Sequence, residues 1–317
     1  MKKALIIGAA GFVGSYLIDH IQKNCIWSIA VTKLPHEKID IPQIDIYDLD
    51  ITDQEAVKEV LEKAEPDYIF HLAAQSSVGL SWKNPGLTVD VNVKGTLSLL
   101  DAVRAWGGKP RILLIGSGEE YGHIHPDETP VKEDTVLRPG NIYAVTKACQ
   151  NMLGAIYTKA YDMDIVMVRA FNHIGPGQAP IFVASDFCLQ TAEIEAGKRE
   201  AVIRVGNLAA RRDFTDVRDV VRAYELLMEY GKKGETYNVG SGNAVEIREL
   251  LERILKMSKV PVKVEVDQAR LRPVDIPVIE ADITKLTVDT GWKAQIPLEE
   301  TLCCTLEYWR RKTRAGE

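Results

Sequence analysis

Short apolar runs alternate with helix-like segments through the first half of the chain, and this alternation limits the possible folds more than any other feature. The runs of strand length are Ala4–Ile7, Trp27–Val31, Asp67–Ala73, Arg111–Ser117 and Asp164–Arg169, with Ile44–Leu49 as a possible further strand. The helical patterns between them are Gly11–Lys23, Gln54–Lys63, Thr88–Trp106 and Asn141–Tyr161. Strands that alternate with helices of this length form parallel β–α–β units. The sequence therefore predicts an α/β fold with a doubly wound parallel sheet.

The rhythm changes after Phe171. Residues Asn172 to Pro180 are rich in Gly and Pro, a composition typical of a loop. The segments predicted beyond this loop are one strand, Val202–Val205, and the helices Phe182–Ala196, Val217–Tyr230, Ile247–Met257 and Leu298–Arg311. This half is less regular and suits a smaller, C-terminal α/β lobe that binds substrate.

Length and charge narrow the class of protein. The 317 residues are about twice the roughly 150 of one domain. The 26% charged and 46% hydrophobic residues are ordinary for a globular protein, which excludes a collagen, a coiled-coil rod or a disordered tail. The 39 Lys and Arg against 45 Asp and Glu leave a net charge of −6, so we expect neither nucleic acid nor an anionic membrane as partner. A small anionic ligand in a pocket with its own local charge remains open.

Cysteine usage favours a reducing compartment. The five cysteines include no Cys-x-x-Cys pair, and reduced thiols in the cytoplasm are the better interpretation. No apolar run has the length of a membrane span, and the apolar stretch after Lys2 and Lys3 is interrupted by glycines. His123-x-His125 with Asp127 and Glu128 lacks metalloenzyme spacing, so no metal site is expected.

A glycine triplet lies directly between the first strand and the first helix. It reads Gly8-Ala9-Ala10-Gly11-Phe12-Val13-Gly14. Glycines let backbone amides approach a pyrophosphate, and the helix N-terminus adds donors and a positive dipole. A tight strand-to-helix turn is the alternative, since the spacing differs from the common G-x-G-x-x-G. The position after the first strand favours dinucleotide binding.

The end of the second strand bears on the choice of cofactor. An acid there would bind the ribose 2′-hydroxyl of NAD, whereas a cation would accommodate the 2′-phosphate of NADP. Here Thr32 and Lys33 precede the first acid, Glu37. These residues favour NADP, with NAD also possible, although a solvated loop lysine would look the same.

Tyr143 and Lys147 stand four residues apart in a predicted helix and therefore share one helical face. A free tyrosine has a pKa near 10, and a nearby ammonium and an oxidised nicotinamide would both stabilise the phenolate and lower that value. Ser117, at the end of the preceding strand, could polarise the same substrate oxygen. A Tyr-x-x-x-Lys motif alone is common by chance. Together with the glycine triplet upstream and Ser117, a chance occurrence is a poor explanation.

Taken together, these motifs resemble the extended short-chain dehydrogenase/reductase family. The likeness covers nearly the whole chain, because Asp50-Ile51-x-Asp53, His71-Leu72-Ala73-Ala74-Gln75 and Asn92-Val93-x-Gly95-Thr96 also match family positions. The resemblance implies hydride exchange between a nicotinamide and a sugar-nucleotide carbon. It implies that Ser117 and Tyr143 hold the carbonyl, that Tyr143 passes the proton, and that Lys147 also grips the nicotinamide ribose.

The same resemblance implies a cofactor site and a division into domains. The implied cofactor contacts are Gly8, Gly11, Phe12, Val13, Gly14, Thr32, Lys33, Asp50, Ile51, Leu72, Ala73, Ala74, Asn92, Tyr143 and Lys147. We expect residues 1–170 and 215–240 to form an NAD(P)-binding Rossmann domain. Residues 171–214 and 241–317 would form the sugar-nucleotide-binding domain.

Motifs in the second half point to one branch of the family. Residues 171–178, 205–208, 212–219 and 270–273 look like those of GDP-mannose 4,6-dehydratases and GDP-4-keto-6-deoxymannose reductases. A diphosphate favours bidentate guanidinium partners. The expected substrate contacts are Asn172, Val183, Asn207, Arg212 and Arg272. Any single arginine could instead form a surface ion pair.

The choice between reductase and dehydratase depends on Glu119. A dehydratase needs a carboxylate beside the serine to remove the C5 proton, and Glu119 occupies the matching position. The Asn172–Gln178 run looks like that of reductases, and the chain lacks the insertions and the arginine-bearing arm of dehydratases. We therefore predict reduction of GDP-4-keto-6-deoxy-D-mannose to GDP-D-rhamnose. The alternatives are GDP-mannose 4,6-dehydratase or another nucleotide-sugar dehydratase or epimerase, and a non-catalytic NAD(P)-binding sensor.

A homodimer is expected from resemblance only. Relatives form a four-helix contact through the helices that correspond to Thr88–Trp106 and Asn141–Tyr161. The apolar residues compatible with such a contact are Leu97, Leu100, Val103, Met152 and Ile156. The same residues are equally compatible with packing on the sheet.

Overall fold

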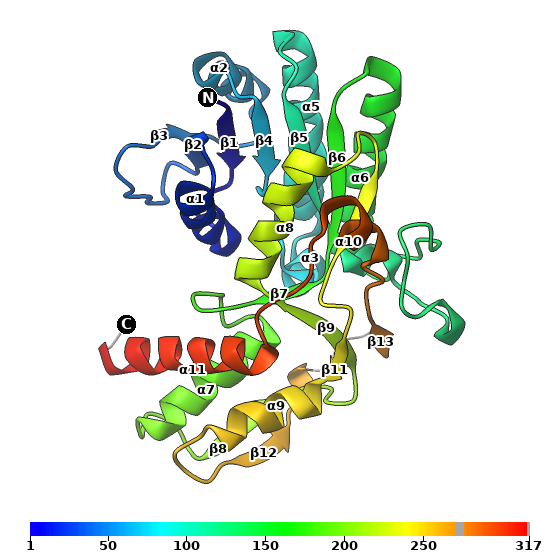
Figure 1. The fold of residues 1–317 in the computed structure, drawn as a ribbon. Helices are drawn as coiled ribbons and strands as arrows, with labels where there is room; N and C mark the ends of the chain where they lie inside the picture. Colours follow the sequence, from blue (N-terminus) through cyan, green and yellow to red (C-terminus); the bar gives the residue numbers. More distant parts are fainter. Residues whose placement is uncertain (271–275, 316–317) are drawn as a thin grey trace.

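A seven-stranded parallel sheet forms the larger part of the molecule (Figure 1). The computed structural model describes residues 1–270 and 276–315, and within them the strand order is β10-β6-β5-β4-β1-β2-β3. The strands are β1 (Lys3–Ile7), β2 (Ser28–Lys33), β3 (Asp45–Asp48), β4 (Tyr68–His71), β5 (Arg111–Ser117), β6 (Ile165–Ala170) and β10 (Thr236–Val239). The order reverses direction between β1 and β4, as in a doubly wound sheet. The predicted fold class is confirmed.

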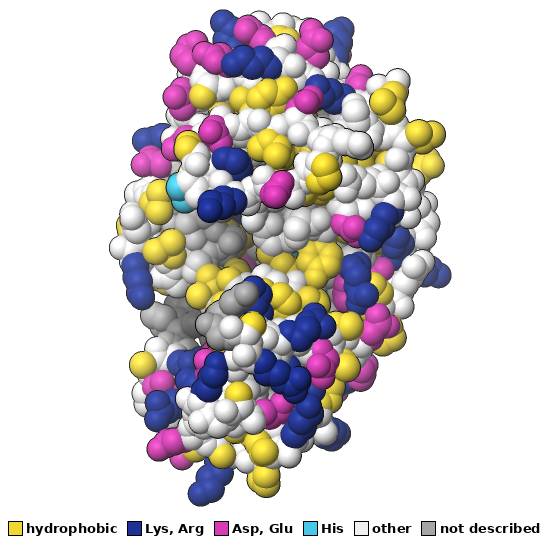
Figure 2. Space-filling view, turned by 90° about the vertical axis from the view of Figure 1, so that its left-hand side faces the viewer, with side chains coloured by type: hydrophobic (Ala, Val, Ile, Leu, Met, Phe, Trp, Pro, Cys, Tyr) yellow, Lys and Arg dark blue, Asp and Glu magenta, His cyan; other side chains and the backbone are white. Residues whose placement is uncertain are grey.

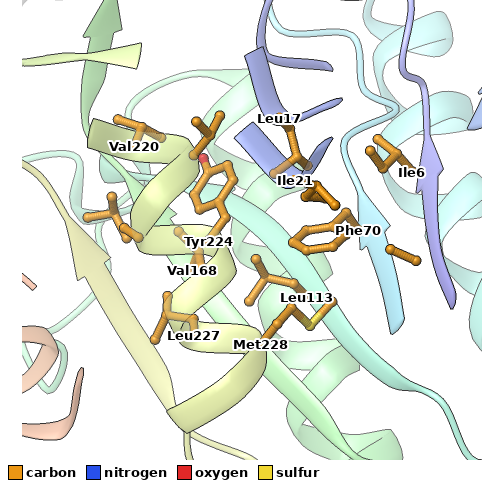
Figure 3. Packing of buried hydrophobic residues seen from close by; sticks show 14 of the residues in the cluster. Ile6, Leu17, Ile21, Phe70, Leu113, Val168, Val220, Tyr224, Leu227 and Met228 are labelled. Atoms are coloured by element: carbon orange, nitrogen blue, oxygen red, sulfur yellow. The ribbon is translucent and has the colours of Figure 1, made fainter. Parts of the chain in front are cut away.

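Helices cover both faces of this sheet, because its strands are apolar on both sides. Helices α1 (Phe12–Asn24) and α8 (Val217–Tyr230) lie on one face, and α2 (Gln54–Ala64), α5 (Gly95–Trp106) and α6 (Ile142–Tyr161) lie on the other. Along β1, Ala4 and Ile6 join the first cluster, whereas Leu5 and Ile7 join the second. Figure 3 shows Tyr224 and Leu227 of α8 beside Phe70 and Val168 of the strands. The two hydrophobic clusters hold the ends of the strands in fixed positions, and the candidate active site lies at these ends.

The long helix expected at Thr88–Trp106 is interrupted. The chain forms α3 (Val78–Lys83), α4 (Pro85–Val89), one π-helical turn at Asp90–Lys94 and then α5. A π-turn inserts one residue per turn and often marks a functional site. Here it carries Asn92, which is fully buried; its Nδ2 donates to Thr146 Oγ1 at 3.0 Å and to the Gln75 carbonyl at 3.1 Å. The distortion thus directs a buried amide toward α6.

The second half builds a smaller unit below the first sheet (Figure 1). Its described strands are β7 (Asn172–Ile174), β9 (Arg211–Asp216), β11 (Ala244–Glu246) and β13 (Val278–Ile279) in one sheet, and β8 (Val202–Val205) and β12 (Lys263–Val266) in another. Its helices are α7 (Val183–Glu195), α9 (Ile247–Lys256) and α11 (Leu298–Ala315), which share one hydrophobic cluster; α10 (Thr284–Thr290) packs near β10 and α8 instead. The predicted strand β8 and the predicted helices agree with the structure, whereas the other strands were not predicted.

The chain passes repeatedly between these units. It leaves the large sheet after β6, forms β7 to β9, and returns through α8 to add β10. It leaves again for β11 to β13, comes back to place α10 near β10 and α8, and ends in α11. The strand β9 lies directly before α8, and β7 lies directly after β6. Both short connections end near the carboxyl ends of β5 and β6, where parallel sheets place their ligands. Among the described helices, none has the length and apolar character needed to cross a membrane.

Candidate active site

The three glycines of the turn after β1 differ in the space that each would leave for a side chain. Gly8 has a φ of +82°, and a Cβ on it would lie 2.7 Å from the Ala73 backbone. A Cβ on Gly14 would lie 2.1 Å from the Ala9 carbonyl oxygen, so α1 packs tightly on the turn. A Cβ on Gly11 would make only an ordinary 3.6 Å contact, with the Gly8 carbonyl oxygen. Gly11 is therefore not needed for the fold, which leaves ligand approach as its reason.

The N-terminus of α1 fits a dinucleotide. Gly11 is its N-cap and supplies no side-chain acceptor to the first-turn amides, of which the Gly14 amide donates to the Gly11 carbonyl at 3.1 Å. A pyrophosphate at this place would receive backbone N–H groups and the positive end of the helix dipole. Gly11, Phe12 and Val13 stand at this terminus, as the sequence predicted.

Thr32 and Lys33 lie at the end of β2, beside the glycine turn. Thr32 is 1% exposed, and its Oγ1 accepts a hydrogen bond from the Gly8 amide at 3.1 Å. It thus braces the glycine turn from β2. The Lys33 ammonium forms an ion pair with Asp48 at the end of β3. A 2′-phosphate of NADP that contacts Lys33 would therefore compete with Asp48 for this cation.

The remaining predicted cofactor residues lie along the carboxyl ends of β1, β3 and β4. Leu72 donates its amide to the Ile7 carbonyl at 3.0 Å, and Ala73 packs against Gly8, with Ala74 following half-buried. Ile51 is buried against Gly95. The side chain of the exposed Asp50 accepts from the Thr52 amide at 2.9 Å. These residues edge the same end of the sheet as the glycine turn.

The Phe12 ring links this end to the second half of the chain. It stacks on the His173 ring with centroids 6.2 Å apart and planes 7° apart. The neighbouring Tyr16 hydroxyl donates to the Pro176 carbonyl at 2.7 Å. The glycine turn therefore contacts the 172–178 loop directly.

Ser117 and Tyr143 are brought together at the end of β5. Ser117 is the last residue of β5, and Tyr143 stands in the first turn of α6, which Asn141 caps through a 2.8 Å bond from the Ala144 amide. The two side chains are hydrogen-bonded, which lowers the pKa of the phenol, but burial raises it by more. The expected lowering by Lys147 is absent here. Tyr143 is a neutral phenol, suited to giving a proton.

Lys147 turns its ammonium toward the β5 backbone. Its Nζ donates to the Ile115 carbonyl at 2.7 Å and to Gln150 Oε1 at 3.1 Å. Burial lowers the pKa of Lys147 to about 8, against an opposing effect from Glu120. The amine therefore titrates close to neutral pH, on the same helical face as Tyr143.

One pocket joins the predicted residues of the two halves. Its lining consists of Ser117, Gly118, Glu119, Ala170, Phe171, Asn172, Arg212, Asp213 and Ile279. Glu119 Oε2 accepts from Asn141 Nδ2 at 3.1 Å. The buried Arg212 donates from Nη1 to the Ile276 carbonyl at 2.7 Å and to the Arg211 carbonyl at 2.9 Å. A serine, a carboxylate and a guanidinium thus face one space.

Two predicted substrate residues within the described part of the chain are not part of this lining. Val183 is the first residue of α7, and Asn207 follows β8, where its Oδ1 accepts from the Ala209 amide at 2.9 Å. Arg272 lies outside the described residues. The pocket therefore joins Asn172 and Arg212, but not Val183 or Asn207, to the Ser117 end of the site.

Sequence reasoning missed three polar residues beside the pocket. Asp213 is buried and accepts from the Ser241 amide at 2.7 Å and the Gly242 amide at 2.9 Å, which shapes one wall. Glu120 and Arg169 form a buried ion pair behind Ser117. A signal for Glu120 did exist, because Ser117-x-x-Glu120 is the spacing of a capping box, and the structure forms one.

Other candidate chemistry stays apart from this site. Among the described residues no group of three or more His, Cys, Asp or Glu side chains could hold a metal ion. The His123 and His125 rings contact each other edge to face. All five cysteines are free thiols. On the face shown in Figure 2, Lys and Arg side chains gather over the lower part of the molecule, despite the net charge of −6.

Comparison with known proteins identifies relatives of this chain. A family model described as GDP-mannose 4,6 dehydratase matches residues 5–304. A GDP-6-deoxy-D-mannose reductase of Pseudomonas aeruginosa is 31% identical over 313 residues, covering 99% of each chain. A GDP-mannose 4,6-dehydratase of Vibrio cholerae is 27% identical, covering 94% of this chain and 91% of its own.

Solved structures agree in fold. The RMD protein of Pseudomonas aeruginosa in complex with NADPH superposes with a TM-score of 0.88 at 29% identity, covering 98% of this chain and all of its own. A UDP-glucose 4-epimerase of Thermus thermophilus with NAD gives 0.86 at 26% identity, covering 97% and 99%. The match over residues 5–304, with these relatives, shows that the chain belongs to the GDP-mannose 4,6-dehydratase family of extended short-chain dehydrogenases/reductases.

Proposed function

We propose that this chain is an NAD(P)-dependent oxidoreductase that reduces the C4 keto group of GDP-4-keto-6-deoxy-D-mannose to give GDP-D-rhamnose. The cofactor is NADP, with NAD possible. The full-length similarity to a GDP-6-deoxy-D-mannose reductase supports the substrate class, and the NADPH-bound relative supports the cofactor.

The observation that carries the proposal is the shared pocket. Ser117, hydrogen-bonded to Tyr143, faces the same space as Asn172 and Arg212. A hydroxyl pair suits a ketone oxygen, and a guanidinium suits an anionic diphosphate. The site therefore offers one end for the reacting carbonyl and another for the charged part of a nucleotide sugar.

The protein's part of the reaction is to place and protonate an oxygen. The bound nicotinamide supplies the hydride that adds to C4. Ser117 donates to the carbonyl oxygen, and Tyr143 gives that oxygen its proton as negative charge develops. Lys147 stands beside the phenol with a charge that stabilises the resulting phenolate. Since the Tyr143 phenol is neutral in this structure, it is ready to act in the direction of reduction.

Dehydration of GDP-mannose is a second candidate because of Glu119. Its carboxylate lines the pocket next to Ser117 and is held by Asn141. A carboxylate there could remove the C5 proton of an oxidised sugar. The two activities differ in what they consume, so one assay separates them.

Incubation with GDP-4-keto-6-deoxy-D-mannose and NADPH is expected to consume the reduced cofactor, followed as loss of its nicotinamide absorbance. NADH serves as the parallel arm, and GDP-mannose without added reductant tests the dehydratase. Turnover of GDP-mannose alone would establish dehydration. Absence of oxidation with both reduced cofactors would refute the reductase.

We also propose that the chain forms a homodimer through α6. Of the expected contact residues, Leu100 and Val103 are buried in the sheet core, so packing on the sheet accounts for them. In contrast, Met152 is 54% exposed and Ile156 is 58% exposed, and they lie with Val145 along one side of α6. This apolar stripe supports a contact between two copies.

Replacing Met152 and Ile156 together by Glu is expected to convert a dimer into a monomer, because two carboxylates per chain would be buried in the contact. Light scattering after size exclusion measures the mass. Val288→Glu, at another exposed apolar position, is the matched control and should remain dimeric. A monomeric unmodified chain, or a double variant that stays dimeric, would contradict the proposal.

We also propose a division into two domains and a cellular compartment for this protein. Residues 1–170 and 215–240 would bind the cofactor, and 171–214 and 241–317 the sugar nucleotide; the return of the chain through α8 and β10 supports this division. The five free thiols support a reducing compartment, the cytoplasm.

A further inference from the structure

Glu120 is a fully buried carboxylate directly behind Ser117. Its Oε1 accepts from the Ser117 amide at 2.8 Å and from Asn151 Nδ2 at 2.9 Å. Its Oε2 accepts from the same Asn151 nitrogen at 2.7 Å and from Arg169 Nε at 3.2 Å. One side chain thus connects the end of β5 with α6 and β6.

The strand leaves room for this carboxylate. A Cβ on Gly116 would lie 2.3 Å from Glu120 Oε1 and 2.6 Å from Asn151 Nδ2. Any larger residue at position 116 would displace the group. The space behind Ser117 is therefore shaped to hold a carboxylate and its donors.

The hydrogen-bond donors around Glu120 favour its ionised form. Burial raises the pKa of Glu120 above its usual value, and the Arg169 guanidinium, the Ser117 amide and the Asn151 amide offset this only in part. Among the described residues, the hydrogen-bond partners of its two oxygens are all donors, so a carboxyl proton would have no acceptor among them. Arg169 is itself fixed by the Tyr121 hydroxyl at 2.9 Å and the Glu133 carbonyl at 2.8 Å.

We propose that Glu120 is a positioning residue of the active site: its buried, charged carboxylate joins the Ser117 amide to Asn151 of α6 and Arg169 of β6, and so fixes the end of β5 beside the helix that carries Tyr143 and Lys147. The proposal rests on the acid–base roles of the proposed function. Glu120 does not touch the substrate pocket, whose lining includes its neighbour Glu119 instead.

Few charged or titratable groups surround Tyr143 and Lys147. Tyr143 faces Glu119 and Glu120 of the turn after β5, and Tyr224 of α8. Lys147 faces Glu120, and His71 of β4. Burial lowers the pKa of His71 to about 3 and raises that of Tyr224, so both are neutral near pH 7.

The sign of the Glu120 effect is the same on both groups. Its negative charge raises the pKa of Lys147 and the pKa of Tyr143, because it favours the protonated form of each. Reduction needs the phenol proton and the ammonium, so the rate falls as pH rises through the Lys147 pKa of about 8. Without the charge, this basic limb moves to lower pH.

Glu120→Gln tests the charge at nearly constant shape. We expect the basic limb of kcat to move down by about one pH unit, the usual size for loss of one nearby charge. The double variant Glu120→Gln/Asn151→Asp exchanges amide and carboxylate across a single hydrogen bond and should restore the limb. Glu62→Gln, which removes one exposed carboxylate on α2, is the control and should leave the profile unchanged.

A second readout does not depend on turnover. Carbon-13 NMR of labelled lysines, with the Lys147 signal assigned by its loss in Lys147→Arg, follows the amine directly in the protein without substrate. The Lys147 pKa should fall in Glu120→Gln and recover in the double variant. This result holds even if the substrate assignment is wrong, so the two proposals fail separately.

A lower rate in Glu120→Gln with an unmoved limb and an unmoved Lys147 pKa would overturn the proposal, because it would show a purely structural role. If Glu120→Gln fails to fold, the double variant decides. A limb at the wild-type pH then supports the proposal, and a displaced one overturns it.

Discussion

Tyr143→Phe is expected to lower the rate of ketosugar reduction by about 100- to 10,000-fold, the usual contribution of a general acid. The phenol is buried, hydrogen-bonded to Ser117 and neutral, and in the proposed mechanism it donates the proton to the substrate oxygen. NADPH affinity should stay unchanged, because removal of one hydroxyl leaves Lys147 and the glycine turn intact. Single-turnover absorbance and fluorescence titration with NADPH measure the two quantities.

Tyr161→Phe is the matched control, since Tyr161 is a half-exposed tyrosine at the far end of the same helix. It should keep the full rate. A fully active Tyr143→Phe would show that the proton comes from another group. A loss of NADPH binding in that variant would instead assign Tyr143 to the cofactor.

Gly14→Ala is expected to weaken both the fold and NADPH binding. Its Cβ would lie 2.1 Å from the Ala9 carbonyl oxygen, so α1 must move off the turn. Overpacking of this kind costs about 1–3 kcal/mol, and each 1.4 kcal/mol lost in binding raises Kd about tenfold. Thermal unfolding and fluorescence titration with NADPH measure the two effects.

Gly11→Ala separates the two effects, because its Cβ would make only an ordinary 3.6 Å contact. We expect wild-type unfolding with weaker NADPH binding, since the methyl group would enter the space for the pyrophosphate. Wild-type affinity in both variants would mean that the cofactor does not use this turn.

The first half of the fold could be predicted because its strands are apolar on both faces. Arg111–Ser117 is one strand in the sequence pattern and in the structure. The helix over Thr88–Trp106 was predicted as continuous because periodicity cannot reveal a π-turn; the insertion at Asp90–Lys94 depends on the contacts of the buried Asn92. The local sequence pattern thus predicted the helix but not the π-helical turn within it.

The second half was harder because its central strand is polar. β9 contains Arg212 and Asp213, whose burial depends on partners far along the chain, such as Ile276 and Ser241. Charged residues of this kind are expected at the surface unless they are paired. Such a strand lacks the alternation of apolar and polar residues from which strands are predicted.

The candidate site shows the same limit. Ser117, Tyr143 and Glu119 were found from spacing and resemblance, and they meet as expected. The hydrogen bond from the Gly8 amide to the Thr32 hydroxyl could not be predicted from the motif. Lys147 was expected to lower the pKa of Tyr143, yet burial dominates and raises it. Hydrogen-bond partners and desolvation arise from the fold as a whole, so the motif alone could not supply them.

The late return of the chain to the large sheet has a consequence for synthesis. β6 ends at Ala170, and β10, which covers its outer edge, begins at Thr236, 66 residues later (236 − 170). At about 5–20 residues per second, translation of this interval takes about 3 to 13 s. During that time β6 is an open edge, able to pair with another nascent chain. The ribosome and early chaperones therefore meet an incomplete sheet, and the period of greatest aggregation risk ends only when β10 is added.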